Sequence, residues 1–597
     1  MVFLLAACSQ PVDFCEGTTR LDYAPAPDAP LTTFPDDHWL VDDPSTFTGY
    51  RVELNPDTSP GLGDFPDNYA NWFQHLSTLD GFGLTAGISF LLNGDPLTEL
   101  ADEDVLVAAR TDAGWEPVPV ETLLLDDGWA VMLRPRVALP EDSDVVALVL
   151  TDPASAGCIQ PSNYLAELLD PDGRDVEDHA MGPRFREALE GVDIPPERVA
   201  AMTVFHTQAA TPQSLQVAEF VQTLDPELVF GVCEDRGHLA CDGTLDVVDF
   251  RNEERVVPPG DVEERGRYDL PVRLWMPPGE GPWPTVVCGH GLGGDRYDCE
   301  ALVDEVTALG VALIGVDAVE HGDHPTRSEG DLELIEPLLI FAISVTPPGL
   351  HALRLRDNFR QSAWDKLQLI RALALGVDVD GDGALDLDPD HLAYAGVSLG
   401  ALMGPEPLAL SEDLSGGWLA VGGGRVTQII SDSPSFSILI DVMKPSNYSD
   451  GDVLRGMQFL QTVIEAGDPM VWASHVQADR RVGGPVPDIY LGAVLNDEVV
   501  PNSTNDNLAR AFFAPGIGTE HWPVAEMTFG PGSVQANGPG GATLGYVQHA
   551  TVVRDGTERA ATHAHLHDSD EGLAAIEALL APGLFDEGAG VVLDPDE

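Results

Sequence analysis

The sequence predicts an α/β fold with a doubly wound, mostly parallel sheet, preceded by a smaller domain that is β-sandwich-like. Two observations carry this prediction. From about residue 230, short apolar runs alternate with helix-like runs, which is the pattern of a parallel sheet covered on both faces. From about residue 50 to 152, short alternating strands are separated by turns rich in Gly, Asp and Pro.

The length of 597 residues exceeds what one hydrophobic core supports, so the chain is expected to form several domains. The predicted organisation is a lipoprotein signal remnant and tether at 1–49, a β-sandwich-like domain at 50–152, a helical connector at 153–229 and an α/β domain at 230–597, with lid-like insertions at 328–356 and 425–480. Ile335–Leu355 is singled out because it is more apolar than a surface insertion, which suits a lid or an acyl-binding wall, and an internal core segment is the alternative. Phe436–Leu460 is a second insertion that could complete such a cap.

The charge is strongly acidic, with 99 acidic against 30 basic residues and a formal net charge of −69. A polyanion of this kind repels nucleic acid and anionic lipid surfaces, so neither is expected as a partner. The acidic residues are spread along the chain, which is typical of a solvated surface.

The first residues resemble a bacterial lipobox. Met1 to Ala7 is short and apolar, and Leu-Ala-Ala precedes Cys8, which would be acylated and tether the protein to a membrane. A basic segment is missing ahead of it, and an ordinary buried N-terminal segment is the alternative. We therefore expect an exported protein, either a cell-envelope lipoprotein or a secreted one.

The other six cysteines suit an oxidising compartment. Short separations favour the pairs Cys233–Cys241 and Cys288–Cys299, which leaves Cys15–Cys158 as the third pair among the connectivities that six cysteines allow. Six unrelated buried thiols are the alternative.

The pentapeptide Gly396-Val397-Ser398-Leu399-Gly400 lies between an apolar strand and a helix-like run, which is the context of a nucleophile elbow. A glycine-rich turn that arose by chance is the alternative. A serine hydroxyl needs a base, and the base needs an acid that orients it. After the apolar run 489–494, Asp497 is the predicted acid, with Glu498 as its rival.

Before the last predicted helix, the segment 561–568 contains three histidines. His563 is the favoured base because it is closest to the preceding segment. His565 is the alternate, and His567 remains open. His549 is a weaker candidate, and the His-x-His-x-His pattern could instead bind a metal ion.

Donors for an oxyanion are expected at two backbone N–H groups. Leu399 follows the serine, and Leu292 lies in the loop His290-Gly291-Leu292-Gly293-Gly294 that follows an earlier strand. In this scheme His290 braces the loop and does not act as the base.

Taken in order, the His-Gly-x-Gly-Gly loop, the elbow, the Asp-x-x-Val-Pro segment at Asp497 and the late histidine resemble the α/β-hydrolase superfamily, specifically bacterial serine esterases and lipases. The resemblance covers residues 230–597. It implies hydrolysis of a small-molecule or lipid ester through an acyl-enzyme, with no cofactor for catalysis. A serine peptidase of the same fold, and a non-catalytic surface-binding lipoprotein, are the competing hypotheses. The sequence leaves the oligomeric state open.

An acidic loop precedes the predicted serine strand. Asp378, Asp380, Asp382 and Asp386 occupy positions 1, 3, 5 and 9 of a calcium-loop pattern with Gly383 at position 6. Position 12 is Pro389, so the usual glutamate is missing, and Asp388 or Asp390 would have to replace it. A structural Ca²⁺ is predicted here, and a solvated acidic turn is the alternative.

Overall fold

The computed structural model describes residues 19–23, 31–54, 67–152, 158–170, 181–328, 338–345, 348–437, 440, 444, 446 and 448–597. The chain divides into two compact units, the first comprising Met1–Ala209 and Lys444–Val463, and the second Ala210–Met443 and Ile464–Glu597. Cys8 and Cys15 lie outside the described residues, so the lipid anchor and the Cys15–Cys158 pair stay predictions.

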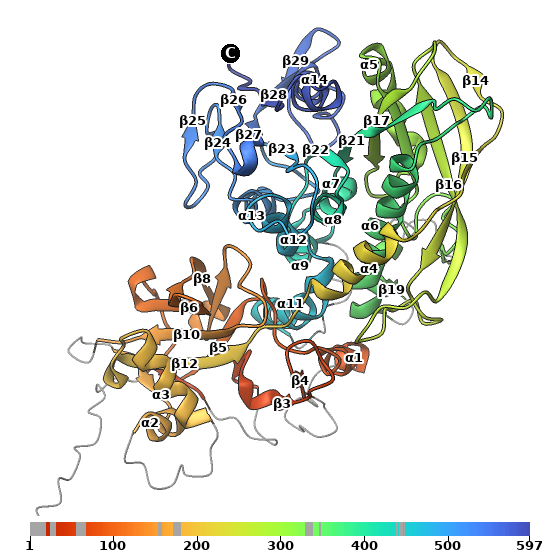
Figure 1. Cartoon of the computed structure of the whole chain (residues 1–597). Coiled ribbons are helices and arrows are strands. Elements are labelled where there is room, and N and C mark those ends of the chain that lie inside the picture. The colour runs from red at the N-terminus through yellow and green to blue at the C-terminus, as the bar shows by residue number, and fades with distance from the viewer. Residues whose placement is uncertain are drawn as a thin grey trace, which may run out of the picture. The chain divides into compact units, whose positions relative to one another are not determined.

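A large mixed sheet organises the second unit, with 12 strands in the described part of the chain (Figure 1). In spatial order these are β13 (Leu228–Phe230), β15 (Leu239–Asp249), β16 (Gly266–Met276), β18 (Ala312–Val316), β17 (Trp283–Gly289), β21 (Leu387–Val397), β22 (Leu414–Ala420), β23 (Asp488–Val494), β27 (Leu544–His549), β24 (Gly516–Ile517) and β25 (Phe529–Gly530), with β14 (Glu234–Asp235) beside β15. From β18 to β25 each pairing is parallel, whereas β15, β16 and β18 pair antiparallel.

Helices cover both faces of this sheet. The helical segments of the described part of the unit include α4 (Pro212–Gln222), η6 (Arg296–Leu302), α5 (Val303–Ala308), α6 (Ala352–Ala374), α7 (Leu399–Met403), α8 (Pro405–Leu410), α9 (Val426–Asp432), α12 (Pro469–Val476), α13 (Asn502–Ala511) and α14 (Asp570–Leu584). Successive residues of β17 point to opposite faces: Val287 belongs to a core with α4, α6, α8, α12 and α13, and Val286 to a core with η6, α5 and α14. The predicted doubly wound arrangement is therefore confirmed.

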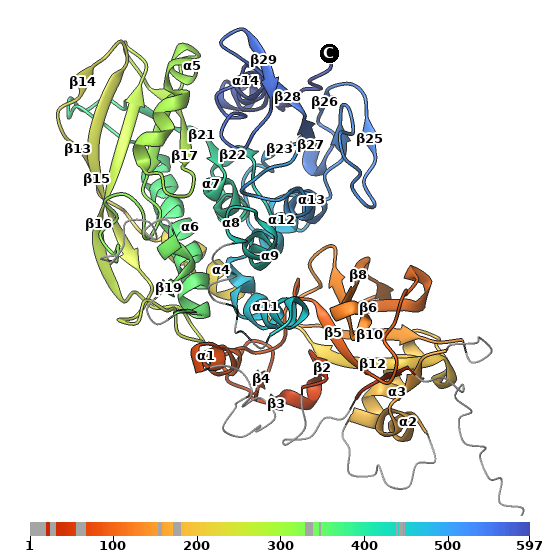
Figure 2. The ribbon, with the colours of Figure 1, turned by 180° about the vertical axis from the view of Figure 1, so that it is seen from behind.

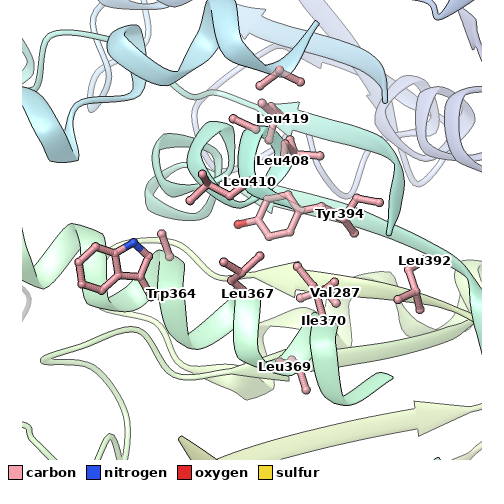
Figure 3. Packing of buried hydrophobic residues seen from close by; sticks show 14 of the residues in the cluster. Val287, Trp364, Leu367, Leu369, Ile370, Leu392, Tyr394, Leu408, Leu410 and Leu419 are labelled. Atoms are coloured by element: carbon pink, nitrogen blue, oxygen red, sulfur yellow. The ribbon is translucent and has the colours of Figure 1, made fainter. Parts of the chain in front are cut away.

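The longest helix, α6, lies alongside β15 and β16 in both views (Figures 1 and 2). Its start is capped by His351, whose Nδ1 accepts a hydrogen bond from the Arg354 N–H at 3.2 Å. Trp364, Leu367 and Ile370 of this helix pack toward Val287 in the core (Figure 3). Leu392 and Tyr394 of β21, which ends at Val397 just before Ser398, belong to the same closely packed apolar cluster.

Two separate sheets form most of the first unit. One consists of β11 (Gln160–Pro161), β1 (Arg20–Leu21), β5 (Ile88–Asn93), β9 (Ala130–Pro135) and β8 (Val120–Leu125), with β2 (Thr33–Phe34) on β5; the other consists of β12 (Val199–His206), β10 (Asp144–Leu150), β6 (Val105–Thr111) and β7 (Gly114–Pro117). The helices α2 (Asn163–Leu169) and α3 (Met181–Gly191) share a buried core with β10 and β12. The β-rich character is as predicted, and a true sandwich stays a prediction.

The boundary between the units differs from the predicted one. Because β12 pairs with β10, the expected connector at 153–229 belongs to the first unit as far as Ala209. Part of the second predicted insertion also packs there. In α11 (Asp450–Ile464), Phe459 meets Phe34 edge to face and Phe73 at a tilt, with ring centroids 4.5 and 5.2 Å apart. Burial of this aromatic cluster gives the physical reason for the difference.

None of the helices described by the structure is long and apolar enough to span a membrane.

Candidate active site

Ser398 occupies the sharp turn between β21 and α7. Its φ of 53° and ψ of −115° lie in a region that side-chain-bearing residues rarely adopt, as the elbow prediction requires. The turn needs glycine beside it: a Cβ on Gly400 would lie 2.1 Å from the Gly289 carbonyl oxygen at the end of β17. The hydroxyl of Tyr394 also donates to the Gly400 carbonyl at 2.6 Å, which fixes the start of α7.

His563 joins Ser398 to Asp497. Its Nε2 lies 2.8 Å from Ser398 Oγ, and its Nδ1 lies 2.8 Å from each carboxylate oxygen of Asp497. The Asp497 carboxylate also accepts the N–H groups of Val499 and Val500, each at 2.9 Å. Because the carboxylate can only accept, Nδ1 carries the proton that it shares with Asp497, and Nε2 is free to accept the serine proton.

The alternative candidates for the acid and the base do not take part in this hydrogen-bonded line. Glu498 is exposed and its side chain does not contact His563, whereas the side chain of Asp497 is fully buried. The Nδ1 of His565 lies 2.7 Å from the Thr562 hydroxyl. His549 is buried against the Tyr490 hydroxyl, at 2.9 Å from its Nε2, and burial lowers the pKa of His549 to about 4. Only His563 therefore has the geometry of the predicted base among these candidates.

The alternative of a metal site at the three histidines finds no support within the described residues. There, the only group of at least three metal-binding side chains whose ligand atoms converge is Asp378, Asp380 and Asp382.

The loop after β17 has the features of an oxyanion loop. Ala318 donates its N–H to Nε2 of His290 at 3.0 Å, so the proton of this imidazole is on Nδ1, which donates to the Gly291 carbonyl at 2.8 Å. Burial lowers the pKa of His290 to about 3 and keeps the ring neutral. Both ring nitrogens of His290 are therefore engaged with the backbone, which suits the predicted bracing of the loop.

The two predicted donors are available in this geometry. Within the described residues, neither the Leu292 N–H nor the Leu399 N–H has a hydrogen-bond acceptor. Leu399 is the first residue of α7, where backbone N–H groups have no intrahelical partner. Leu292 lines the same cavity as Ser398.

A buried carboxylate that the sequence analysis did not single out anchors the start of η6, directly after this loop. Asp317 follows β18 and accepts the backbone N–H of Arg296 at 2.7 Å and that of Asp323 at 2.8 Å, and it also pairs with the Arg296 guanidinium. The side chain of Asp317 is fully buried. The available signal was its position, directly after an apolar strand at the carboxyl edge of the predicted sheet.

A cavity of about 500 Å³ opens beside Ser398. Its lining is mostly apolar and includes the disulfide-bonded Cys288 and Cys299, together with Leu302 and Phe436. Its polar groups besides the triad include Asp298, His567 and Ser435, and burial raises the pKa of Asp298. A cavity of this size and composition is typical of a small-molecule site.

Two of the predicted disulfides are present within the described residues, Cys233–Cys241 and Cys288–Cys299.

The first three carboxylates of the acidic loop converge. Carboxylate oxygens of Asp378, Asp380 and Asp382 lie within 4.8 Å of one another, and these side chains are exposed. Asp386 instead accepts the Val379 N–H at 2.7 Å, which closes the loop on itself.

No protein-family model and no curated protein matches the chain. Among solved structures it is similar to acetyl xylan esterase 1 from Thermoanaerobacterium, with 12% identity over 63% of this chain and 94% of that chain and a TM-score of 0.36. It is also similar to an esterase from Pyrobaculum calidifontis, with 12% identity over 64% of this chain and 92% of that one and a TM-score of 0.29. An acylaminoacyl peptidase from Pyrococcus horikoshii matches with 12% identity over 62% of this chain and 50% of that chain, at a TM-score of 0.30.

The fold class follows from the molecule itself and not from these distant likenesses. A serine elbow follows one central parallel strand, and an oxyanion loop follows a neighbouring one. The residues Ser398, Asp497 and His563 occur in that order along the chain. The second unit therefore has the arrangement of elements that is typical of the α/β-hydrolase fold.

Proposed function

We propose that the protein is a serine hydrolase that cleaves carboxylic esters through an acyl-enzyme on Ser398. The observation that carries the proposal is the continuous hydrogen-bonded line Ser398–His563–Asp497 at the wall of an apolar cavity. Since each link is 2.8 Å long, the serine, the imidazole and the carboxylate are already aligned for proton transfer.

In the proposed mechanism, Ser398 Oγ attacks the ester carbonyl carbon as its proton moves to His563 Nε2. The N–H groups of Leu292 and Leu399 stabilise the negative charge that develops on the carbonyl oxygen. The imidazolium, paired with Asp497, gives the proton to the departing alkoxide, and an alcohol leaves. Water then attacks the acyl-enzyme with His563 as base, which releases the carboxylic acid and restores Ser398.

The experiment is turnover of p-nitrophenyl acetate and butyrate by the full chain, by Ser398→Ala and by Ser533→Ala, an exposed serine in the same unit. We expect burst kinetics for the wild type and for Ser533→Ala, and a loss of at least about a thousandfold for Ser398→Ala. Cleavage of a matched p-nitroanilide faster than the ester would favour a peptidase. No turnover of either by the wild type would favour a binding protein.

We also propose that the protein is exported and acylated at Cys8. In this proposal the first unit folds as a β-sandwich and serves as a spacer or binding module between the lipid anchor and the hydrolase. The two disulfides suit an oxidising compartment. The membrane would then be contacted only through the lipid. Incorporation of labelled palmitate into the expressed chain tests this, and labelling that persists in Cys8→Ser contradicts it.

A further inference from the structure

The ring of Phe436 forms part of the wall of the Ser398 cavity. Phe436 is 7% exposed and comes from the segment after α9, which the sequence analysis marked as a second insertion that could complete a cap. Val499, from the loop that carries Asp497, lines the same cavity. A large aromatic side chain at this place limits the space available to a substrate.

A second apolar segment holds this ring in place. Phe341, which is 3% exposed, meets Phe436 edge to face with centroids 5.8 Å apart and packs on Phe359 of α6 at 6.0 Å. The backbone before Phe341 is fixed as well, because Asn358 of α6 donates to the Ile340 carbonyl at 3.1 Å. Phe436 thus rests on a buried aromatic stack that reaches the longest helix.

The same wall is tied to the triad. The residue before Phe436, Ser435, donates its hydroxyl proton to the Glu498 carbonyl at 2.8 Å. Glu498 directly follows Asp497, so the position of the ring is coupled to the loop of the triad carboxylate. The aromatic stack holds the ring of Phe436, and the Ser435–Glu498 hydrogen bond holds its backbone. The distance from this ring to Ser398 is therefore fixed, as a limit on the length of the acyl chain requires.

The cavity has a second apolar wall, made by the Cys288–Cys299 disulfide with Leu302 and Val397. Between this wall and Phe436 the lining offers an ester chain apolar contacts and no charged partner other than Asp298 and the histidines. This space therefore suits a hydrocarbon chain.

The alcohol part of an ester has to face His563, because its oxygen takes the proton from Nε2. His563, Ala564 and His567 line that side of the cavity and come from one segment before α14. Phe436 comes from a different element, so we assign its ring to the side of the cavity that contacts the acyl part of the ester. We propose that Phe436, backed by Phe341, sets the longest acyl chain that the enzyme accepts and restricts it to esters of short apolar acids. This inference rests on the proposed ester hydrolysis.

The test compares kcat/KM for p-nitrophenyl acetate, butyrate, octanoate and dodecanoate. The wild type is expected to prefer butyrate or acetate over dodecanoate. In Phe436→Ala the dodecanoate-to-butyrate ratio should rise at least about tenfold, since a pocket discriminates by about that factor per unit of chain it can or cannot hold. Phe513→Ala removes a ring that is 61% exposed and should leave the profile unchanged.

Two further variants keep the test sharp if Phe436→Ala does not fold. Phe341→Ala removes only the backing ring and should shift the profile in the same direction but less. Phe436→Trp should depress butyrate relative to acetate. An unchanged acyl profile in all three variants overturns the inference, and so does a change that appears only when the alcohol is varied at a fixed acyl group.

Failure of the inference and failure of the proposed function are distinguishable. If the wild type reacts with a fluorophosphonate at Ser398 and turns over esters, an unchanged acyl profile overturns only the role of Phe436. If the wild type neither labels nor turns over any ester, the proposed function falls and the acyl limit falls with it.

Discussion

Cys288 and Cys299 are joined by a disulfide that closes the base of the oxyanion loop. Cys288 is the residue before the last one of β17, and Cys299 lies in η6. Between them lie His290, which braces the loop, and Leu292, whose N–H is one of the two predicted oxyanion donors. The bridge therefore restrains the segment that carries the proposed donor Leu292.

Breaking this bridge is expected to lower kcat more than it raises KM, because the oxyanion donor acts mainly on the transition state. In the double variant Cys288→Ser/Cys299→Ser, a loss of about tenfold to a hundredfold in kcat is predicted, which is less than the roughly 10²- to 10³-fold cost of removing one such donor outright, because the donor is loosened and not deleted. The matched control is Cys233→Ser/Cys241→Ser, which removes the other bridge of the same unit. Equal kcat losses in the two double variants would contradict a specific role.

The three neighbouring histidines are expected to differ sharply. His563→Ala removes the only one of them that bonds to both Ser398 and Asp497, so ester turnover should fall by about 10⁴-fold. His565→Ala removes a ring bonded to Thr562 and should change kcat/KM only a few-fold. The check is steady-state kinetics on p-nitrophenyl butyrate for both variants. A deeper loss in His565→Ala would reverse the assignment of the base.

The three residues that the structure joins by hydrogen bonds could be picked out in the sequence because their signals are local. The glycines around Ser398, the Asp-x-x-Val-Pro segment at Asp497 and the position of His563 before the last helix each depend on a few neighbouring residues. Two disulfides followed from short separations for the same reason. In each case the backbone turn or the strand end that carries the residue requires particular residue types beside it, and these can be recognised in the sequence.

The features that the sequence did not predict depend on contacts between residues far apart in the chain. The support of Arg296 by Asp317 joins two loops at the ends of neighbouring strands, and the pairing of β12 with β10 moves a predicted connector into the first unit. The packing of Phe459 on Phe34 joins residues that are far apart in the sequence. Hydrophobic periodicity shows that such residues are buried but not which partners they bury against.

Lys366, one of the two lysines in the chain, gives a prediction about pH and stability. It is 1% exposed, its ammonium donates to the Ser362 carbonyl at 3.2 Å, and burial lowers the pKa of Lys366 from 10.5 to about 8. Between pH 8 and 10.5 the unfolded chain binds the proton that the folded chain has lost, so this group makes the protein more stable as pH rises through that window. Below pH 8 the buried charge costs about 3 kcal/mol.

Lys366→Met is therefore expected to unfold at a higher temperature than the wild type at pH 7, with the difference shrinking as pH rises from 8 to 10.5. Differential scanning calorimetry across this range measures it. Lys444→Met is the control, because Lys444 is 26% exposed and pairs with Asp450. A gap between wild type and Lys366→Met that is constant with pH would contradict the account.

The loop of Asp378, Asp380 and Asp382 is expected to bind Ca²⁺ and to stabilise the start of the strand that ends at Ser398. Calcium at about a hundred times its dissociation constant should add about 3 kcal/mol to the free energy of unfolding. Thermal unfolding in calcium and in a chelator measures the effect, and Asp380→Asn is the matched variant. An unfolding temperature that does not respond to calcium would reject the site, and the loop would then be a solvated acidic turn.

The central claim is that Ser398 is a nucleophile activated by His563. The most direct measurement is the intact mass of the full chain after reaction with a fluorophosphonate, followed by mapping of the modified peptide. The account predicts one added group per chain on the peptide that contains Ser398, none in Ser398→Ala, and much slower labelling in His563→Ala. Labelling of Ser398→Ala at the wild-type rate, or no labelling of the wild type, would contradict it.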